Sequence, residues 1–241
     1  MNETTTAESP AAAPTSLWED FLDIFYAPRQ VFERRRGAGY GLLLLILTLI
    51  VTALFFASQG PLAEAYAAEF RRGMANAGAA GQEMTAQQME QAQRMGTIFG
   101  TLAVLIGFPL SVVIIGFVLW ALGKLFGFAA SISAAILVVT YAQFPRLLQS
   151  VAALVQGLML NPESLAATSL GPARFVDPDT ASAMLLATLM RLDLFYIWST
   201  ALIALGARVI GRVPGAQAII LAVLVWVVGA LPTLAGAMFS G

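Results

Sequence analysis

Three charged residues stand inside long apolar stretches of this sequence: Arg146, Arg191 and Asp193. A charge within a membrane span costs about 3 kcal/mol or more unless it is paired or hydrated, so such residues mark binding sites, ion paths or structural contacts. Three glutamines lie near Arg146, two on its helix face and one about a turn before it. The sequence therefore predicts a buried polar core with six members: Gln143, Arg146, Gln149, Gln156, Arg191 and Asp193.

The predicted polar core has two interpretations. Arg146 and Asp193 fall in spans that are neighbours in sequence and antiparallel, so they are expected to form an ion pair. Such a pair is either a polar clasp that holds two helices in register or part of an ion or substrate path. Arg191 points to a different helix face from Asp193 and is expected to reach toward the outer headgroups.

Catalytic chemistry has little support in the composition. The chain has no Cys and no His, which removes disulfides, thiolate nucleophiles, Cys/His zinc sites and histidine bases. It contains no phosphate-binding glycine loop and no G-x-S-x-G nucleophile motif. We expect no enzyme activity, no metal and no cofactor, and the net charge of −1 predicts no nucleic-acid partner.

The elements that position these residues are apolar helices. The chain is 59% hydrophobic and 11% charged, whereas a soluble domain carries roughly 25% charged residues. An uncharged run of about 20 residues is long enough to cross a bilayer as a helix. We predict an all-α polytopic membrane bundle over residues 38–240, with five spans at about 38–58, 96–122, 129–159, 181–207 and 216–239.

Two breaks are expected within this arrangement. The third span is interrupted near Pro145, and the proline-rich stretch 161–180 forms a loop. Before the second span, Thr85 and Gln88 have the spacing of a capping box. A long helix is therefore expected to start at about Ala86 and to continue into that span.

The segment that precedes the first span is amphipathic. Residues 1–15 are predicted to be a disordered tail, and residues 16–37 a cytoplasmic interfacial segment with a helix starting at Ser16. Four apolar residues share one stripe of this helix: Trp18, Phe21, Leu22 and Phe25. Pro28 interrupts the helix or opens a second one. Three acidic residues that lie largely off the stripe are expected to face solvent: Glu19, Asp20 and Asp23.

The basic cluster that follows is formed by Arg34, Arg35 and Arg36. It is interpreted as a topology signal that faces anionic lipid, with docking of a cytoplasmic partner as the alternative. Basic residues near span ends place the N-terminus in the cytoplasm and the C-terminus in the periplasm. One lysine against twelve arginines suggests GC-rich coding, and hence a bacterial inner membrane.

Three segments together resemble one known family. The first runs from Leu22 to Glu33 and includes Pro28 and Phe32; the second is Tyr141-Ala-Gln-Phe-Pro145; the third starts at Leu192, includes Trp198 and continues to Leu205-Gly206. In order and spacing they resemble the Yip-domain proteins, relatives of the Ypt/Rab-interacting membrane proteins. The resemblance implies a five-span bundle and makes Pro28, Phe32, Tyr141, Pro145 and Trp198 the motif positions, with Asp193 beside them.

The eukaryotic members of that family bind prenylated Rab-type GTPases in vesicle traffic, and a bacterial chain would lack this partner. The leading hypothesis is a non-enzymatic Yip-like inner-membrane protein that organises lipids or partner proteins. Its expected partners are membrane lipids and a membrane or cytoplasmic protein. The alternative is a small transporter or channel that uses the polar core around Arg146 and Asp193.

Overall fold

The structure is a computed structural model that describes residues 16–74 and 85–239. Within these ranges every regular element is a helix, as predicted. The predicted tail, residues 1–15, lies outside the described residues.

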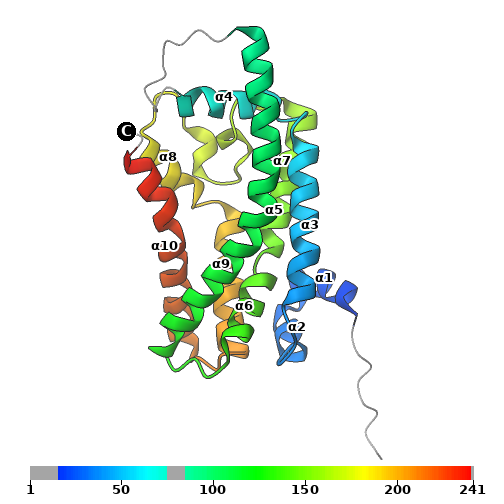
Figure 1. The fold of residues 1–241 in the computed structure, drawn as a ribbon. Helices are drawn as coiled ribbons and strands as arrows, with labels where there is room; N and C mark the ends of the chain where they lie inside the picture. Colours follow the sequence, from blue (N-terminus) through cyan, green and yellow to red (C-terminus); the bar gives the residue numbers. More distant parts are fainter. Residues whose placement is uncertain (1–15, 75–84, 240–241) are drawn as a thin grey trace, which may run out of the picture.

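The first helices lead from the lower end of a bundle to its upper end (Figure 1). Helices α1 (Leu17–Tyr26) and α2 (Pro28–Arg34) lie against the lower part of the bundle. Helix α3 (Gly41–Ser58) then rises along one side, and α4 (Ala63–Met74) lies across the upper end. Helix α5 (Ala86–Lys124) returns along the full length of the bundle.

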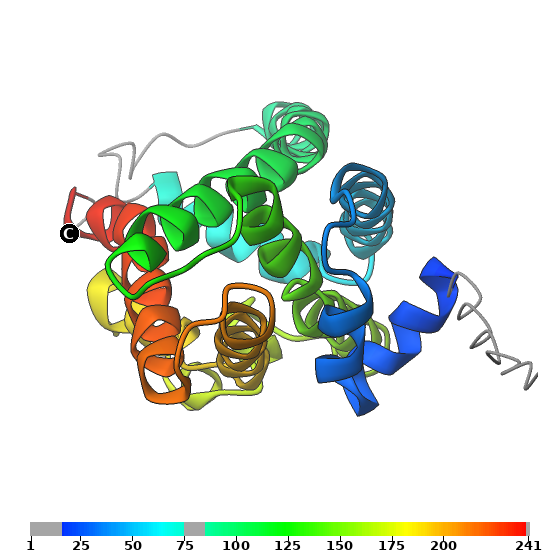
Figure 2. The same ribbon diagram turned by 90° about the horizontal axis from the view of Figure 1, so that it is seen from below.

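The second half of the chain completes the bundle. Helices α6 (Ile132–Tyr141) and α7 (Phe144–Leu160) climb one after the other from the lower end. Helices α8 (Ala183–Met190) and α9 (Leu194–Val209) descend, and α10 (Gly215–Phe239) rises again. Seen from below, α9 lies beside α10, and α1 and α2 lie at the margin of the bundle (Figure 2).

The predicted helix starts are confirmed at Ser16, as an N-cap, and at Thr85, as a full capping box. The Ser16 hydroxyl accepts the amide of Glu19, and the Thr85 hydroxyl accepts the amide of Gln88. The Gln88 side chain accepts the Thr85 amide in return, at 2.9 Å. The long helix expected from Ala86 is present, and it continues without interruption into the second predicted span.

Several apolar helices make this chain a membrane protein, but their lengths differ from the prediction. Three described helices are long and apolar enough to cross a bilayer: Gly41–Ser58, Arg94–Lys124 and Gly215–Met238. The fourth predicted span is a pair, α8 and α9, bent by 54°. The third is divided into α6 and α7 at residues 142–143. Pro145 lies in the first turn of α7, where its missing amide hydrogen costs nothing.

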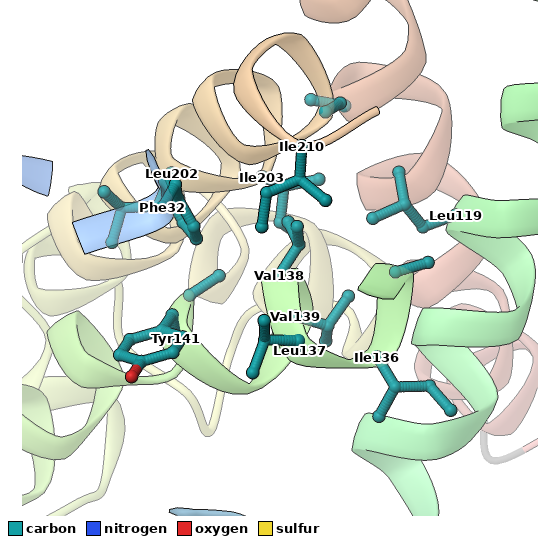
Figure 3. Packing of buried hydrophobic residues seen from close by; sticks show 14 of the residues in the cluster. Phe32, Leu119, Ile136, Leu137, Val138, Val139, Tyr141, Leu202, Ile203 and Ile210 are labelled. Atoms are coloured by element: carbon teal, nitrogen blue, oxygen red, sulfur yellow. The ribbon is translucent and has the colours of Figure 1, made fainter. Parts of the chain in front are cut away.

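Helix α6 forms the centre of the core. Its residues from Ala135 to Tyr141 are all buried, because α5, α9 and α2 surround it (Figure 3). Val138 faces Ile203 of α9 and Ile210 directly after α9, and Ile136 faces α5. Close approach depends on glycine: a Cβ added at Gly206 would clash with Val138. Helix α6, whose residues are apolar on all sides, therefore lies at the most enclosed position of the bundle.

Loop residues 161–180 cover the upper end, as predicted, and contain two short 3₁₀ helices, η2 (Ala166–Thr168) and η3 (Pro172–Phe175). Arg72 of α4 donates to Asp179 of this loop at 2.7 Å. The upper surface is thus tied together by α4 and the loop.

Candidate functional site at the N-terminal junction

Three segments far apart in the sequence meet where α1 and α2 pack on the bundle. We call their contact the aromatic junction, and its members are Phe21, Phe25, Phe32, Tyr141, Phe144 and Trp198. Phe32 of α2 lies 6.0 Å from Tyr141 of α6, and Phe25 of α1 lies 5.5 Å from Trp198 of α9, both ring to ring and edge-on. Edge-to-face contacts of this kind are worth about 1 kcal/mol each beyond area burial. The segments that carry the family resemblance thus form one site.

The motif positions lie at or beside this junction. Pro28 opens α2 at its first position, and Phe32 is fully buried. Tyr141 ends α6, also fully buried, and Pro145 is buried one turn further along the chain. Trp198 is half-buried on α9.

A buried carboxylate anchors α1 beside the aromatic junction. Asp20 is fully buried, and it accepts from Arg34 at 2.7 Å, from Arg35 at 2.5 Å and from the Tyr141 hydroxyl at 2.5 Å. Arg34 also donates to Asp23 at 2.7 Å. We call these five residues the N-terminal ion network. The network joins α1, α2 and α6 through charge-assisted hydrogen bonds.

The electrostatics of the N-terminal ion network raise the pKa of Arg34 and so favour its charged form. Burial lowers the pKa of Arg34, but hydrogen bonds to Asp23 and Asp20 and the charges of both carboxylates more than offset it, so the net shift is upward. Removing one member of a buried ion pair strands the other charge, at a cost of about 3–5 kcal/mol. The network therefore fixes where α1 and α2 dock.

One expectation about these residues was wrong. Asp20 does not lie on a solvated face, because it points into the bundle toward Tyr141. In the basic cluster, Arg34 and Arg35 pair with Asp20, whereas Arg36 is exposed and donates to the carbonyl of Val209 at 2.9 Å. A partial signal was present in the sequence: acidic residues on α1 and arginines on α2 flank the turn at Pro28, so a helical hairpin brings them together.

The opposite side of α1 is apolar and exposed. Trp18, Leu22 and Tyr26 follow each other at four-residue spacing, and they are 71%, 55% and 85% exposed. Phe21 and Phe25, which belong to the same predicted stripe as Trp18 and Leu22, instead pack into the aromatic junction. The helix therefore has two apolar faces, one against the bundle and one outward.

The predicted ion pair between Arg146 and Asp193 is wrong. Asp193 is fully buried and starts α9, where its side chain accepts the amide of Phe195 at 2.9 Å. Its other oxygen accepts the Ser169 hydroxyl at 2.8 Å and the Leu170 amide at 2.7 Å. The carboxylate of Asp193 thus accepts three hydrogen bonds, two from the loop and one from α9, and so fastens the loop of residues 161–180 to α9.

Arg146 instead binds a tyrosine. It is exposed on α7 and donates to the Tyr196 hydroxyl at 2.9 Å, with its guanidinium 4.4 Å from the centre of the ring. Arg191 lies 5.3 Å from the same ring centre and donates to the Gly229 carbonyl and to Thr233 of α10. We call Arg146 and Arg191 the arginine pair.

The remaining members of the predicted polar core do not gather around an ion pair. Gln143, Gln149 and Gln156 are half-buried, and Gln156 donates to the Thr168 carbonyl in the upper loop at 3.0 Å. Only Asp193 among the six is buried. The apolar helix α6 takes the centre, so the polar residues of α7 are displaced toward the loop and the surface. Nowhere in residues 16–74 and 85–239 do three acidic, His or Cys side chains gather as a metal ion would require.

The apolar helices, the enclosed α6 and the docked N-terminal hairpin define a polytopic α-helical membrane protein. The family model of the Yip1 domain matches residues 22–236, nearly the whole described chain. The protein belongs to the Yip1 domain family, which confirms the resemblance drawn from the three segments. Neither a curated protein nor a solved structure matches it.

Proposed function

We propose that this Yip1 domain protein is a non-enzymatic membrane protein that organises lipids or partner proteins through its N-terminal hairpin and bundle. One observation carries the proposal: α1 is anchored from within and apolar outside. Its inner face is held by Asp20, while Trp18, Leu22 and Tyr26 face outward. Amphipathic rings of Trp and Tyr suit the headgroup region of a bilayer.

The proposed topology has five passes through a bacterial inner membrane, with the N-terminus in the cytoplasm and the C-terminus in the periplasm. It counts α6 with α7 as one broken pass and α8 with α9 as another. The hairpin and the lower turns would then lie on the cytoplasmic side, with three basic residues near the turns: Lys124, Arg208 and Arg212. Basic residues beside span ends favour that side.

A transporter or channel function has lost its main support. It depended on a charge pair between Arg146 and Asp193, and those two side chains have separate partners. Asp193 is fully buried and satisfied by donors from the loop and α9. The organising function needs no such path.

Site-specific photo-crosslinking in the native membrane tests the proposal. A photo-reactive amino acid replaces Leu22 or Tyr26 on the outer face of α1, and adducts are identified by mass spectrometry of both lipids and proteins. We expect lipid or protein adducts at both positions, because their side chains face away from the bundle.

Ile24 provides the matched control on the same helix, since it is fully buried. A photo-reactive group there should give adducts only within the chain. Adducts of Leu22 and Tyr26 that are also only internal would show that the outer face of α1 meets neither lipid nor partner, and the proposal would fail.

A further inference from the structure

The arginine pair combines two like charges in one place without a carboxylate. No ion pair of the described residues includes Arg146 or Arg191, whereas Arg34 and Arg35 both have Asp20. Both guanidiniums lie within 5.3 Å of the centre of the Tyr196 ring. Two cations held on one ring repel each other, and an anion between them would remove that repulsion.

Most of the N–H donors of the arginine pair have no acceptor among the described residues. A guanidinium has five N–H donors in a planar fork that matches phosphate and carboxylate oxygens. Among the described residues, Arg146 donates only to Tyr196, and Arg191 only through Nη2 to Gly229 and Thr233. The contact to the Gly229 carbonyl fixes Arg191 on α10, so one member of the pair is held in place.

Exposed leucines stand next to the members of the site in the sequence. They are Leu148 on α7, and Leu192 and Leu194 beside the start of α9. Acyl chains can pack on such leucines while a headgroup meets the arginines, an arrangement that a soluble anion would not need. Exposed leucines beside the two cations in the sequence therefore favour a lipid over a free anion.

The position of the pair along the bundle agrees with a headgroup. Arg146 follows Phe144 by two residues, and Tyr196 precedes Trp198 by two, which is about 3 Å of helix rise in each case. Phe144 and Trp198 both pack against Phe25 of α1. If α1 lies among the headgroups, the arginine pair lies within reach of the phosphates of the same leaflet.

We propose that Arg146, Arg191 and Tyr196 form a binding site for the phosphate of an anionic phospholipid. The inference rests on the proposed function and adds a lipid class to it. The depth of the site in the bilayer follows from the placement of α1 among the headgroups. Arg146 supplies the exposed side of the site, and Arg191 the side fixed to α10. Tyr196 holds the two guanidiniums together through its ring.

Lipid titration of the purified full-length protein tests the site. The protein in a neutral detergent is titrated with phosphatidylglycerol or with phosphatidylcholine of the same chains, and bound lipids are counted by native mass spectrometry. We expect tighter binding of phosphatidylglycerol. Loss of each arginine as R146Q or R191Q should weaken it roughly fivefold, and the double variant on the order of 25-fold.

The matched control is R174Q. Arg174 is exposed in η3 and also lies over an aromatic ring, that of Phe175 at 5.9 Å, but it has no second arginine beside it. Its loss should leave the phosphatidylglycerol affinity unchanged. R146K with R191K keeps both charges and should retain most of the binding. If the double glutamine variant is less stable, R146Q alone decides, because Arg146 is exposed.

Equal binding of the two lipids, or an affinity for phosphatidylglycerol that R146Q leaves unchanged, would overturn the site while leaving the crosslinking result for α1 intact. Excess inorganic phosphate separates the two possible sources of the anion. We expect phosphatidylglycerol to stay bound in its presence, since the leucines hold its chains. Complete displacement by inorganic phosphate would overturn the assignment to a lipid.

Discussion

The N-terminal ion network and the arginine pair are built from the same residue types and differ in one. Each contains two arginines and a tyrosine: the Tyr141 hydroxyl donates to Asp20 in the network, and both guanidiniums of the pair lie over the ring of Tyr196. The network also contains the buried carboxylate of Asp20, while the pair has no acidic partner in the described part of the chain. The difference separates a structural contact from a binding site: arginines that the chain neutralises fix its fold, and arginines that it leaves charged attract an anion.

Burial separates Arg34 and Arg35 from Arg146, while Arg191 is half-buried. Arg34 and Arg35 are about four-fifths buried, with 21% and 19% of their side chains exposed. Arg146 is exposed. A desolvated arginine requires an internal counter-ion, because its stranded charge would cost several kcal/mol. An arginine that is partly exposed needs no internal counter-ion, so it is free to bind an external phosphate.

The largest expected loss of stability comes from removing the buried carboxylate of the N-terminal ion network. D20A removes the shared partner of Arg34 and Arg35, and we expect it to destabilise the protein by about 3–5 kcal/mol. Thermal unfolding of the detergent-solubilised protein, followed by size-exclusion chromatography, measures the loss.

Glu19 is the control, because it is the neighbouring acidic residue and is exposed. E19A should change the stability by less than about 0.5 kcal/mol. Equal losses in the two variants would mean that α1 is held by its general charge and not by the buried network.

The second expected effect concerns Asp193, which belongs to neither arginine cluster. D193A removes the cap of α9 and leaves the Leu170 amide and the Ser169 hydroxyl without their acceptor, at a cost of about 2–3 kcal/mol. S182A is the matched control: Ser182 caps α8 but holds no loop, so its loss should cost about 1 kcal/mol.

A double variant sharpens the separation of Asp193 from the arginine pair. D193A and R146A should add within about 0.5 kcal/mol, because the two side chains share no partner. A double variant that recovers stability would restore the ion pair that the sequence predicted and would contradict the separation.

Local signals in the sequence predicted the elements well. Several features all depend on neighbours a few residues apart: the N-cap at Ser16, the capping box at Thr85, the start of α2 at Pro28 and the interruption near Pro145. Such contacts are nearly independent of the rest of the fold. The family segments were equally readable, since each is a short contiguous run.

The partners of the charges could not be predicted in the same way. Asp20 meets Tyr141 across 121 residues, and Asp193 meets Ser169 in a loop with no periodic pattern. Helical periodicity identified one apolar stripe on α1, but the helix has two apolar faces with the carboxylate of Asp20 on the bundle side. The prediction from a single apolar stripe therefore placed Asp20 in solvent, whereas it is buried.

The smallest expected effect compares the two tyrosines directly. Y141F removes a hydrogen bond to the buried carboxylate of Asp20 and keeps the ring contact with Phe32, so we expect a loss of about 1.5 kcal/mol. Y196F removes the hydroxyl that accepts from Arg146, which is exposed and can be hydrated instead, so the loss should stay below about 0.5 kcal/mol. The same unfolding assay measures both. Because the two variants remove the same atom, a loss in Y196F that matches Y141F would show that the arginine pair also stabilises the fold from within, and the division between a neutralised and an open cluster would not hold.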